Sequence, residues 1–200
     1  MLAVSTADVR PSSSTELPYR AVSSALPTRF RPADLLRITD QGAVDVLNGR
    51  YDHLLPADGR WPTDQRWAAR LSSDDEVDVW LISWVPDKST ELHDHAGSLG
   101  ALTVLSGALA EYRWTGSELR PRVLEAGDQA SFPIGWVHDV MAAPTAGADA
   151  GADIPDAHPM LSVHAYSPPL TAMSYYEVTT QGSLRRTRTE LTDQPEGNLA

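Results

Sequence analysis

The sequence predicts an all-β protein, a barrel or sandwich preceded by short helices. From about Trp67 onward, short runs rich in branched and aromatic residues alternate with Gly and Pro turns, the pattern of a barrel or a sandwich. Before that point, apolar residues recur at helical spacing. A chain of 200 residues with 42% hydrophobic and 22% charged residues fits one domain with a sizeable core.

The N-terminal part divides into an arm and a helical region. Residues 1–26 are rich in Ser, Thr, Ala and Pro, which predicts a flexible arm. A helix is expected to begin at Pro32 and continue through Ile38, because Pro suits the first helical turn. A second helix is expected from about Asp40 to Gly49, where glycine would end it.

The rest of the chain reads as a series of strands. Residues 142–159 contain little besides Ala, Gly, Asp and Pro and are expected to be a mobile insertion. Residues 181–200 are polar and are expected to be a loose tail, so the folded domain should cover 27–180. Strands are expected at 77–85, 92–95, 101–105, 108–114, 122–125, 128–132, 137–141, 161–166 and 175–179.

Charge and composition exclude several functions. With 16 basic and 27 acidic residues the net charge is −11, and no basic stripe is present to meet nucleic-acid phosphates or an anionic membrane. No apolar run approaches the length of a membrane span. The chain has no cysteine, hence no disulfide, thiolate ligand or cysteine nucleophile. Its first residues lack a secretory signal, so we expect a cytoplasmic protein.

Three histidines form a candidate metal site. His93 and His95 are two residues apart, so on a strand both side chains point to the same face. His138 follows a Gly- and Pro-marked turn and is the expected third ligand. Neutral imidazoles bind iron(II), and they suit zinc, copper and nickel as well. An H-x-H pair alone is common by chance, and the third histidine carries the prediction.

The spacing of these residues resembles the two motifs of the cupin superfamily. The first motif reads G, five residues, H-x-H, three or four residues, E, six residues, G. The second reads G, five residues, P-x-G, two residues, H, three residues, N. The matching residues are His93, His95, Gly107, Gly127, Pro133, Gly135 and His138.

Three motif positions depart from the pattern. Asp87 stands at the opening Gly position, Gly100 at the Glu position and Ala142 at the Asn position. The loss of the Glu leaves three histidines and no acid. This ligand set differs from the two-His-one-carboxylate iron site.

Ser162, His164 and Tyr166 lie on one face of a predicted strand, because they are spaced two residues apart. One interpretation is a half-buried strand whose polar residues happen to alternate. The other is a hydrogen-bonded relay in which His164 fixes the Tyr166 hydroxyl beside a bound substrate. The second interpretation makes all three candidate catalytic residues.

The strings His93-Asp94-His95-Ala96-Gly97-Ser98-Leu99-Gly100 and Ser162-Val163-His164-Ala165-Tyr166-Ser167-Pro168-Pro169 resemble the cysteine dioxygenase (thiol dioxygenase) family. The resemblance runs from about Trp67 to Pro169. It implies a cupin β-barrel of the small jelly-roll type, an Fe2+ cofactor, and oxidation of a small thiol by O2, with L-cysteine and cysteine sulfinate as the expected substrate and product. The alternatives are another thiol such as 3-mercaptopropionate, a non-catalytic metal- or ligand-binding cupin, and a zinc-dependent isomerase.

The resemblance also implies roles for single residues. An Arg a couple of dozen residues before the H-x-H holds the substrate carboxylate in the family. Arg70 is our candidate and Arg66 its competitor, since a guanidinium offers a carboxylate two parallel donors. Gly100 stands where the family has Gly or a Cys crosslinked to the Tyr matching Tyr166, a crosslink that this cysteine-free chain cannot form. A cis bond at Ser167–Pro168 is compatible with the family.

Overall fold

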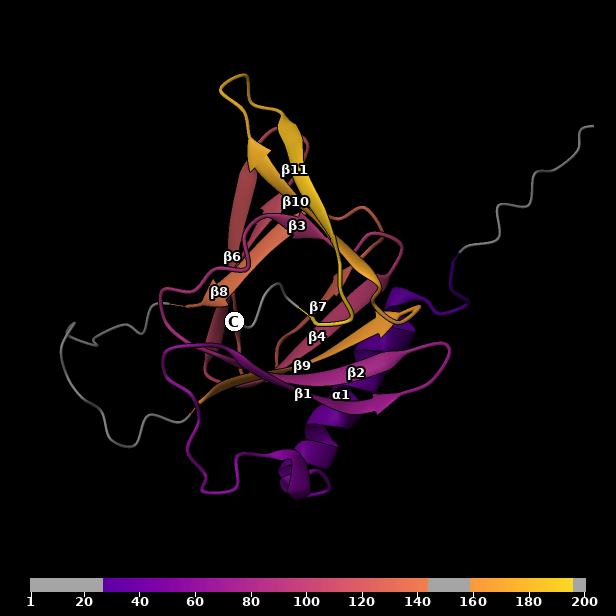
Figure 1. Ribbon diagram of the computed structural model, residues 1–200, viewed down its shortest axis with the longest axis vertical. Coiled ribbons are helices and arrows are strands. Elements are labelled where there is room, and N and C mark those ends of the chain that lie inside the picture. Colours follow the sequence, from indigo (N-terminus) through magenta and orange to yellow (C-terminus); the bar gives the residue numbers. More distant parts are fainter. Residues whose placement is uncertain (1–26, 144–158, 196–200) are drawn as a thin grey trace, which may run out of the picture.

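The computed structural model describes residues 27–143 and 159–195 (Figure 1). The predicted arm 1–26 and almost all of the predicted insertion 142–159 lie outside the described residues. Within the described residues the chain is mostly β, as predicted, with strands in two antiparallel sheets that face each other.

The first sheet has five strands and the second has six, in an order that interleaves distant parts of the chain. The first runs in the order β1 (Trp67–Ser73), β2 (Asp78–Trp84), β9 (Met160–Ser167), β4 (Leu99–Ser106) and β7 (Gln129–Phe132). The second runs in the order β11 (Leu184–Leu191), β10 (Ala172–Val178), β3 (His93–Asp94), β8 (His138–Ala142), β5 (Ala108–Trp114) and β6 (Leu119–Glu125).

Two apolar clusters hold the sheets in place. One fills the space between the sheets and includes Ile82, Leu102, Phe132 and Tyr166. The other lies between the five-stranded sheet and the helix. Strand β2 is therefore buried along its whole length. A strand buried on both faces has a continuous apolar sequence rather than an alternating one. This explains the run of apolar residues from which a strand was predicted at 77–85.

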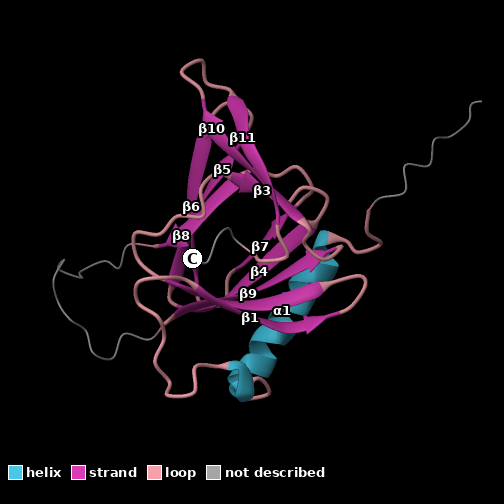
Figure 2. Ribbon diagram, viewed as in Figure 1, coloured by secondary structure: helices cyan, strands magenta, loops and turns pink. Residues whose placement is uncertain are grey.

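One helix, α1 (Pro32–Leu47), replaces the two that the sequence predicted, and it packs on the outer face of the five-stranded sheet (Figure 2). Its start is as expected, with Pro32 in the first turn and the Asp34 carboxylate accepting a hydrogen bond from the Arg31 N–H at 2.8 Å. Gly42 does not interrupt the helix. A Cβ there would lie 2.9 Å from Val163 Cγ1, so glycine lets the helix approach the sheet closely.

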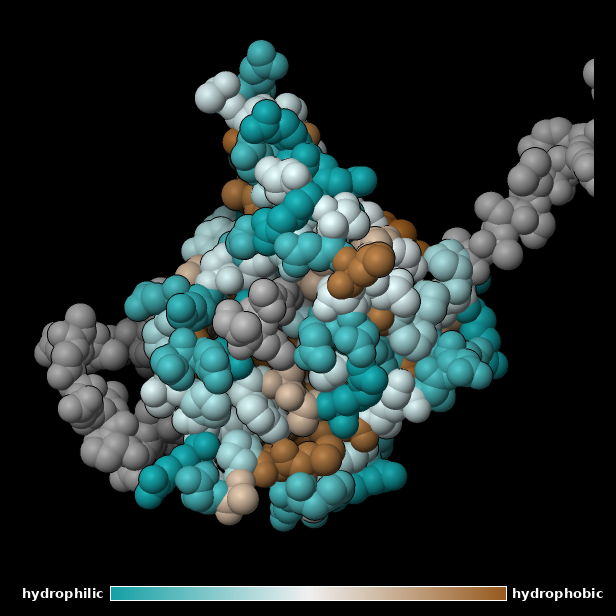
Figure 3. All heavy atoms as spheres, viewed as in Figure 1, coloured by the Kyte–Doolittle hydropathy of each residue, from teal (hydrophilic) through white to brown (hydrophobic). Residues whose placement is uncertain are grey.

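The C-terminal segment differs from the loose tail that the sequence predicted. Residues from Gln181 were expected to be loose, yet β11 pairs along its length with β10. It is the edge strand of its sheet, and nearly all of it is exposed. Charged side chains on an edge strand discourage pairing with other molecules. This polar sequence therefore resembled a tail, and hydrophilic side chains cover much of the projecting hairpin in Figure 3.

Backbone conformation explains two motif positions. Gly107 has a φ of +74°, and a Cβ there would lie 2.4 Å from Met160 Cγ, so only glycine fits. Asp87, at the position of the motif's opening glycine, has a φ of +60°. Asp tolerates this left-handed conformation better than most residues, which explains how the departure is accommodated.

Within the described ranges, no helix combines the length and the apolar character needed to cross a bilayer.

Candidate metal and substrate site

The three predicted ligands come together inside the barrel. His93 of β3 pairs directly with His138 of β8, and His95 follows β3. All three are buried, and one nitrogen of each lies within 4.8 Å of the others. Such a group is close enough to converge on one divalent ion. Neutral imidazole is also a ligand type that transition metals accept, so the residues fit the metal that the motif implies.

Oxygen acceptors set the proton position on two of these rings. His93 Nδ1 lies 2.9 Å from the Glu91 carbonyl oxygen, and His138 Nδ1 lies 3.0 Å from Glu111 Oε1. A carbonyl oxygen accepts hydrogen bonds and cannot donate them, so His93 carries its proton on Nδ1. The lone pair is then on Nε2, the nitrogen suited to bind a metal.

The sequence reading missed Glu111. It lies on β5 with its side chain fully buried, and it also forms an ion pair with Arg122 of β6. Burial raises the pKa of the Glu111 carboxyl, but its hydrogen bonds and electrostatic interactions with His138 and Arg122 outweigh burial and leave the pKa below its usual value. The signal that could have revealed Glu111 is its spacing: it lies two residues after Leu109 in the same strand, so both side chains point to the core face.

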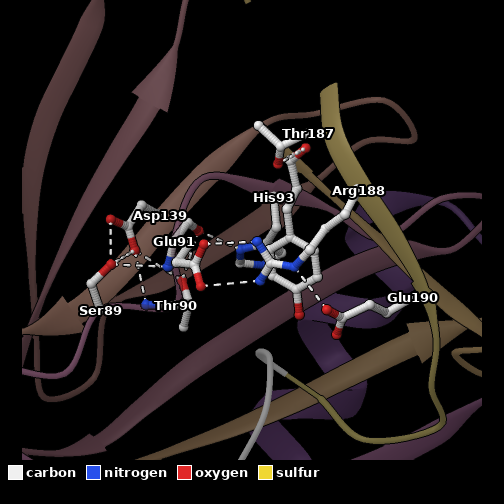
Figure 4. A network of polar contacts seen from close by, with 9 residues as sticks. Ser89, Thr90, Glu91, His93, Asp139, Thr187, Arg188 and Glu190 are labelled. Atoms are coloured by element: carbon white, nitrogen blue, oxygen red, sulfur yellow. Dashed lines mark hydrogen bonds and ion pairs between the residues drawn. The ribbon is translucent and has the colours of Figure 1, made fainter. Parts of the chain in front are cut away.

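A second missed contact ties β11 to the metal site. The guanidinium of Arg188 donates to both carboxylate oxygens of Glu91 at 3.0 Å and to Glu190 at 2.7 Å (Figure 4). It also lies 3.7 Å over the ring of Tyr175. Glu91 has a φ of +61°, and its carbonyl faces His93. Arg188 thus stabilises an unfavourable backbone conformation next to a ligand.

The same loop is fastened on its other side to β8. The Asp139 carboxylate accepts hydrogen bonds from the Ser89 hydroxyl at 2.7 Å and the Thr90 N–H at 3.0 Å. Asp139 directly follows His138 in the sequence. The loop before His93 is therefore anchored beside both paired ligands.

The predicted relay is present on β9, in the facing sheet. Ser162 Oγ lies 2.9 Å from His164 Nε2, and His164 Nδ1 lies 3.0 Å from the Tyr166 hydroxyl. All three side chains are fully buried. The Tyr166 ring is 4.9 Å from the ring of His95, centroid to centroid, so the relay ends beside the metal ligands.

Trp84 extends the relay. Its indole N–H donates to Ser162 Oγ at 2.8 Å, and an indole can only donate. The relay therefore has four members in line, each within hydrogen-bond distance of the next: Trp84, Ser162, His164 and Tyr166. Trp84 is a core residue, and it also supports the relay.

Gly100 adjoins Tyr166 as well. A Cβ at Gly100 would lie 2.9 Å from Phe132 Cδ2 and 3.4 Å from the Tyr166 ring. Glycine therefore permits close packing of β4 against β7 and β9. The Ser167–Pro168 bond, directly after the relay strand, is cis.

The two candidate arginines lie on β1 and just before it. Arg70 pairs with Trp80 of β2, places its guanidinium 4.5 Å over that ring and donates to the Asp193 carboxylate at 2.8 Å. Arg66 is buried, with its guanidinium 5.7 Å from the Trp84 ring. Both adjoin the tryptophans that border the relay, and Arg70 already has a carboxylate partner.

Other aromatic residues have smaller roles. Trp80 is a core residue, whereas Trp114 is only half-buried. Trp136 packs against the cluster between the sheets, with the Arg113 guanidinium 4.5 Å from its ring.

The comparison with protein families agrees with this geometry. Residues 63–179 match the family described as cysteine dioxygenase type I, a match over more than half of the chain. The chain belongs to this family, and the predicted cupin β-barrel is confirmed.

Solved structures similar to this chain share low sequence identity with it. One is an uncharacterized conserved protein with a double-stranded beta-helix domain from Klebsiella pneumoniae, 17% identical over 67% of this chain and 96% of that chain, with a TM-score of 0.43. Another is a cupin superfamily protein from Desulfitobacterium hafniense, 13% identical over 54% and 82%, with a TM-score of 0.40. A third is the DMSP lyase DddQ from Ruegeria pomeroyi, 16% identical over 56% and 50%, with a TM-score of 0.40.

Proposed function

We propose that this protein is an iron(II)-dependent thiol dioxygenase that oxidises L-cysteine to cysteine sulfinate with O2. The observation that carries the proposal is the position of Tyr166, at the end of a buried relay and beside His95, in a chain of the cysteine dioxygenase type I family.

The ligand set supports a thiolate substrate. His93, His95 and His138 would hold the metal, and iron(II) would supply the redox chemistry between O2 and sulfur. Three neutral ligands leave the site with a net positive charge, which favours an anionic thiolate. Both oxygen atoms of O2 join the sulfur. The electrons that reduce O2 come from the sulfur itself, so the reaction needs no other reductant.

The relay would orient the substrate. The chain from Trp84 through Ser162 and His164 holds the Tyr166 hydroxyl in place. A hydroxyl held beside the ligands can orient the substrate sulfur, or the oxygen atoms that it gains.

Arg70 would bind the substrate carboxylate. Its guanidinium holds the Asp193 carboxylate at 2.8 Å, the chemistry that a carboxylate substrate requires. The ion pair is partly exposed, with side-chain exposures of 37% and 67%, so its stabilising energy is small. A substrate could take the place of Asp193 at low cost.

Oxygen uptake tests the proposal. Protein loaded anaerobically with iron(II) is given L-cysteine and 3-mercaptopropionate in parallel, with the His138→Ala variant as control. Uptake with cysteine that the variant loses is expected. Uptake with 3-mercaptopropionate alone would keep the class of reaction and change the substrate. Absence of uptake with either thiol, despite bound iron, would contradict the proposal and favour a non-catalytic or isomerase cupin. The cytoplasmic location stays a prediction.

A further inference from the structure

His138 differs from His93 in the kind of partner that its Nδ1 has. The partner of His93 is a neutral backbone carbonyl, whereas that of His138 is the carboxylate of Glu111, at 3.0 Å. Glu111 is fully buried. A carboxylate is the stronger acceptor, because its charge strengthens the hydrogen bond. The site therefore has negative charge behind one ligand.

The strand register builds this contact. In β5 and β8, Glu111 pairs with Val140 and Arg113 pairs with His138, so Glu111 and His138 are diagonal neighbours, and such neighbours are within reach of long side chains. On its other side Glu111 pairs directly with Arg122 of β6. Three side chains from adjacent strands thus form a row of cation, carboxylate and imidazole.

We propose that Glu111 is a positioning residue of the metal site. It keeps His138 in the Nδ1-protonated tautomer, turns Nε2 toward His93 and His95, and strengthens the imidazole as a ligand. The inference rests on the metal site of the proposed function and assigns that site a supporting residue outside the cupin motifs.

The proposal also accounts for the carboxylate that the first motif lacks. Gly100 occupies the Glu position, so three neutral ligands surround the metal. Glu111 supplies negative charge one residue further out, behind His138. The metal then keeps the positive charge that attracts a thiolate, while one ligand is made a better donor.

Arg122 makes the buried carboxylate tolerable. An isolated buried charge is costly, and a paired one is much less so. The Arg122 side chain is 38% exposed, so its cation remains partly hydrated while it contacts Glu111. Strand β6 therefore contributes to the metal site, although none of its own side chains belongs to the candidate ligand group.

Cobalt(II) affinity tests the role without reference to catalysis. Metal-free full-length protein is titrated anaerobically with Co2+, and the Kd and the visible absorption spectrum are recorded for wild type, Glu111→Ala, Glu111→Gln and Glu177→Gln. Glu177 is a matched control, because it is a partly exposed glutamate paired with Arg185 on the outer hairpin. Each variant is also combined with His138→Ala.

Glu111→Ala is expected to weaken Co2+ binding by about 10- to 100-fold. Glu111→Gln should lose less, because its amide oxygen can still accept from Nδ1, and should change the absorption spectrum through the lost charge. Glu177→Gln should match wild type. In the His138→Ala background, the Glu111 substitutions should have little further effect, because their influence passes through that ring.

Two results would overturn the proposed role of Glu111 without contradicting the metal site itself. One is wild-type Co2+ affinity and spectrum in Glu111→Gln, which also decides the matter if the Ala variant does not fold. The other is a loss of affinity of the same size with and without His138. Failure of the wild type itself to bind Co2+ would overturn the metal site, and the proposed function with it.

Discussion

The two sheets of the barrel supply different parts of the candidate site. The six-stranded sheet carries the paired ligands His93 and His138, and their Nδ1 atoms contact oxygen acceptors. The five-stranded sheet carries the relay that ends at Tyr166. One sheet thus carries paired candidate metal ligands, and the other carries the tyrosine hydroxyl that ends the relay. A reaction that needs a metal and an oriented substrate would need both.

Each sheet also buries a carboxylate, with opposite electrostatic results. Glu111 contacts His138 and Arg122, which hold its pKa below the usual value against the effect of burial. Asp78 accepts a hydrogen bond from the Trp80 indole at 3.1 Å, and burial raises its pKa. Burial alone does not decide the pKa of an acid in this barrel. The strength of the hydrogen bonds and charges beside the acid decides whether the effect of burial is outweighed.

The largest expected effect is the loss of a ligand from the six-stranded sheet. His93→Ala should weaken Co2+ or iron(II) binding by more than about 100-fold, because even the loss of a supporting hydrogen bond to a ligand costs up to that much. Oxygen uptake with a thiol should disappear in parallel. Equilibrium dialysis and an oxygen electrode measure the two effects. Uptake at the wild-type rate would show that the chemistry does not depend on this histidine.

A change in the five-stranded sheet should separate chemistry from metal binding. Tyr166→Phe removes the hydroxyl that ends the relay, and a hydrogen bond to a charged group is worth about 1.5–3 kcal/mol. The rate of thiol oxidation should fall about 10- to 100-fold while the metal Kd stays near that of wild type. Equal losses in both quantities would mean that Tyr166 acts on the metal site rather than on the substrate.

Asp78 predicts a pH dependence of stability. Its pKa in the folded state is raised above the unfolded value of about 3.9, so the folded state binds the proton more tightly. Its contribution to the unfolding free energy is therefore favourable at low pH and is lost as the pH rises from that value through the folded pKa.

Asp78→Asn should remove this dependence and raise the unfolding free energy at neutral pH by an amount on the order of 1 kcal/mol. Urea unfolding from about pH 4 to pH 7 measures the difference. A variant that is less stable than wild type at pH 7 would show that the ionised carboxylate is stabilised by its neighbours after all.

The smallest expected effect concerns the Arg70 ion pair at the edge of the five-stranded sheet. Asp193→Asn should free the guanidinium and lower the KM for cysteine by no more than about fivefold, since exposed ion pairs contribute at most about 1 kcal/mol. The matched substrate is cysteamine, which has no carboxylate and should show no change. An equal change with both thiols would exclude Arg70 as the carboxylate anchor.

The sequence predicted the candidate metal ligands better than the residues that hold those ligands in position. His93, His95 and His138 could be found because turns and strand alternation determine where they point. The relay on β9 followed from the same two-residue period. Glu111 was missed, because its role depends on which strands are neighbours, and strand order is not visible in a local pattern.

The errors at the two ends of the chain have physical causes. The sequence predicted a second helix from about Asp40, whereas α1 continues unbroken to Leu47. The helix packs on the five-stranded sheet, and a Cβ at Gly42 would lie 2.9 Å from Val163 Cγ1, a tertiary contact that propensity does not contain. The strand β11 was read as a tail because an exposed edge strand has no apolar face. Arg188 lies on this strand and binds Glu91. Because the strand was taken for a tail, the sequence did not connect Arg188 with the site.

Oxygen-isotope labelling of the product tests the central claim most directly. The iron-loaded protein is given L-cysteine in an atmosphere of 18O2 and unlabelled water, and the product is analysed by mass spectrometry. The account predicts cysteine sulfinate in which both sulfinate oxygens carry the label, because both atoms of O2 join the sulfur. Cystine as the product, or a sulfinate with oxygen from water, would contradict it.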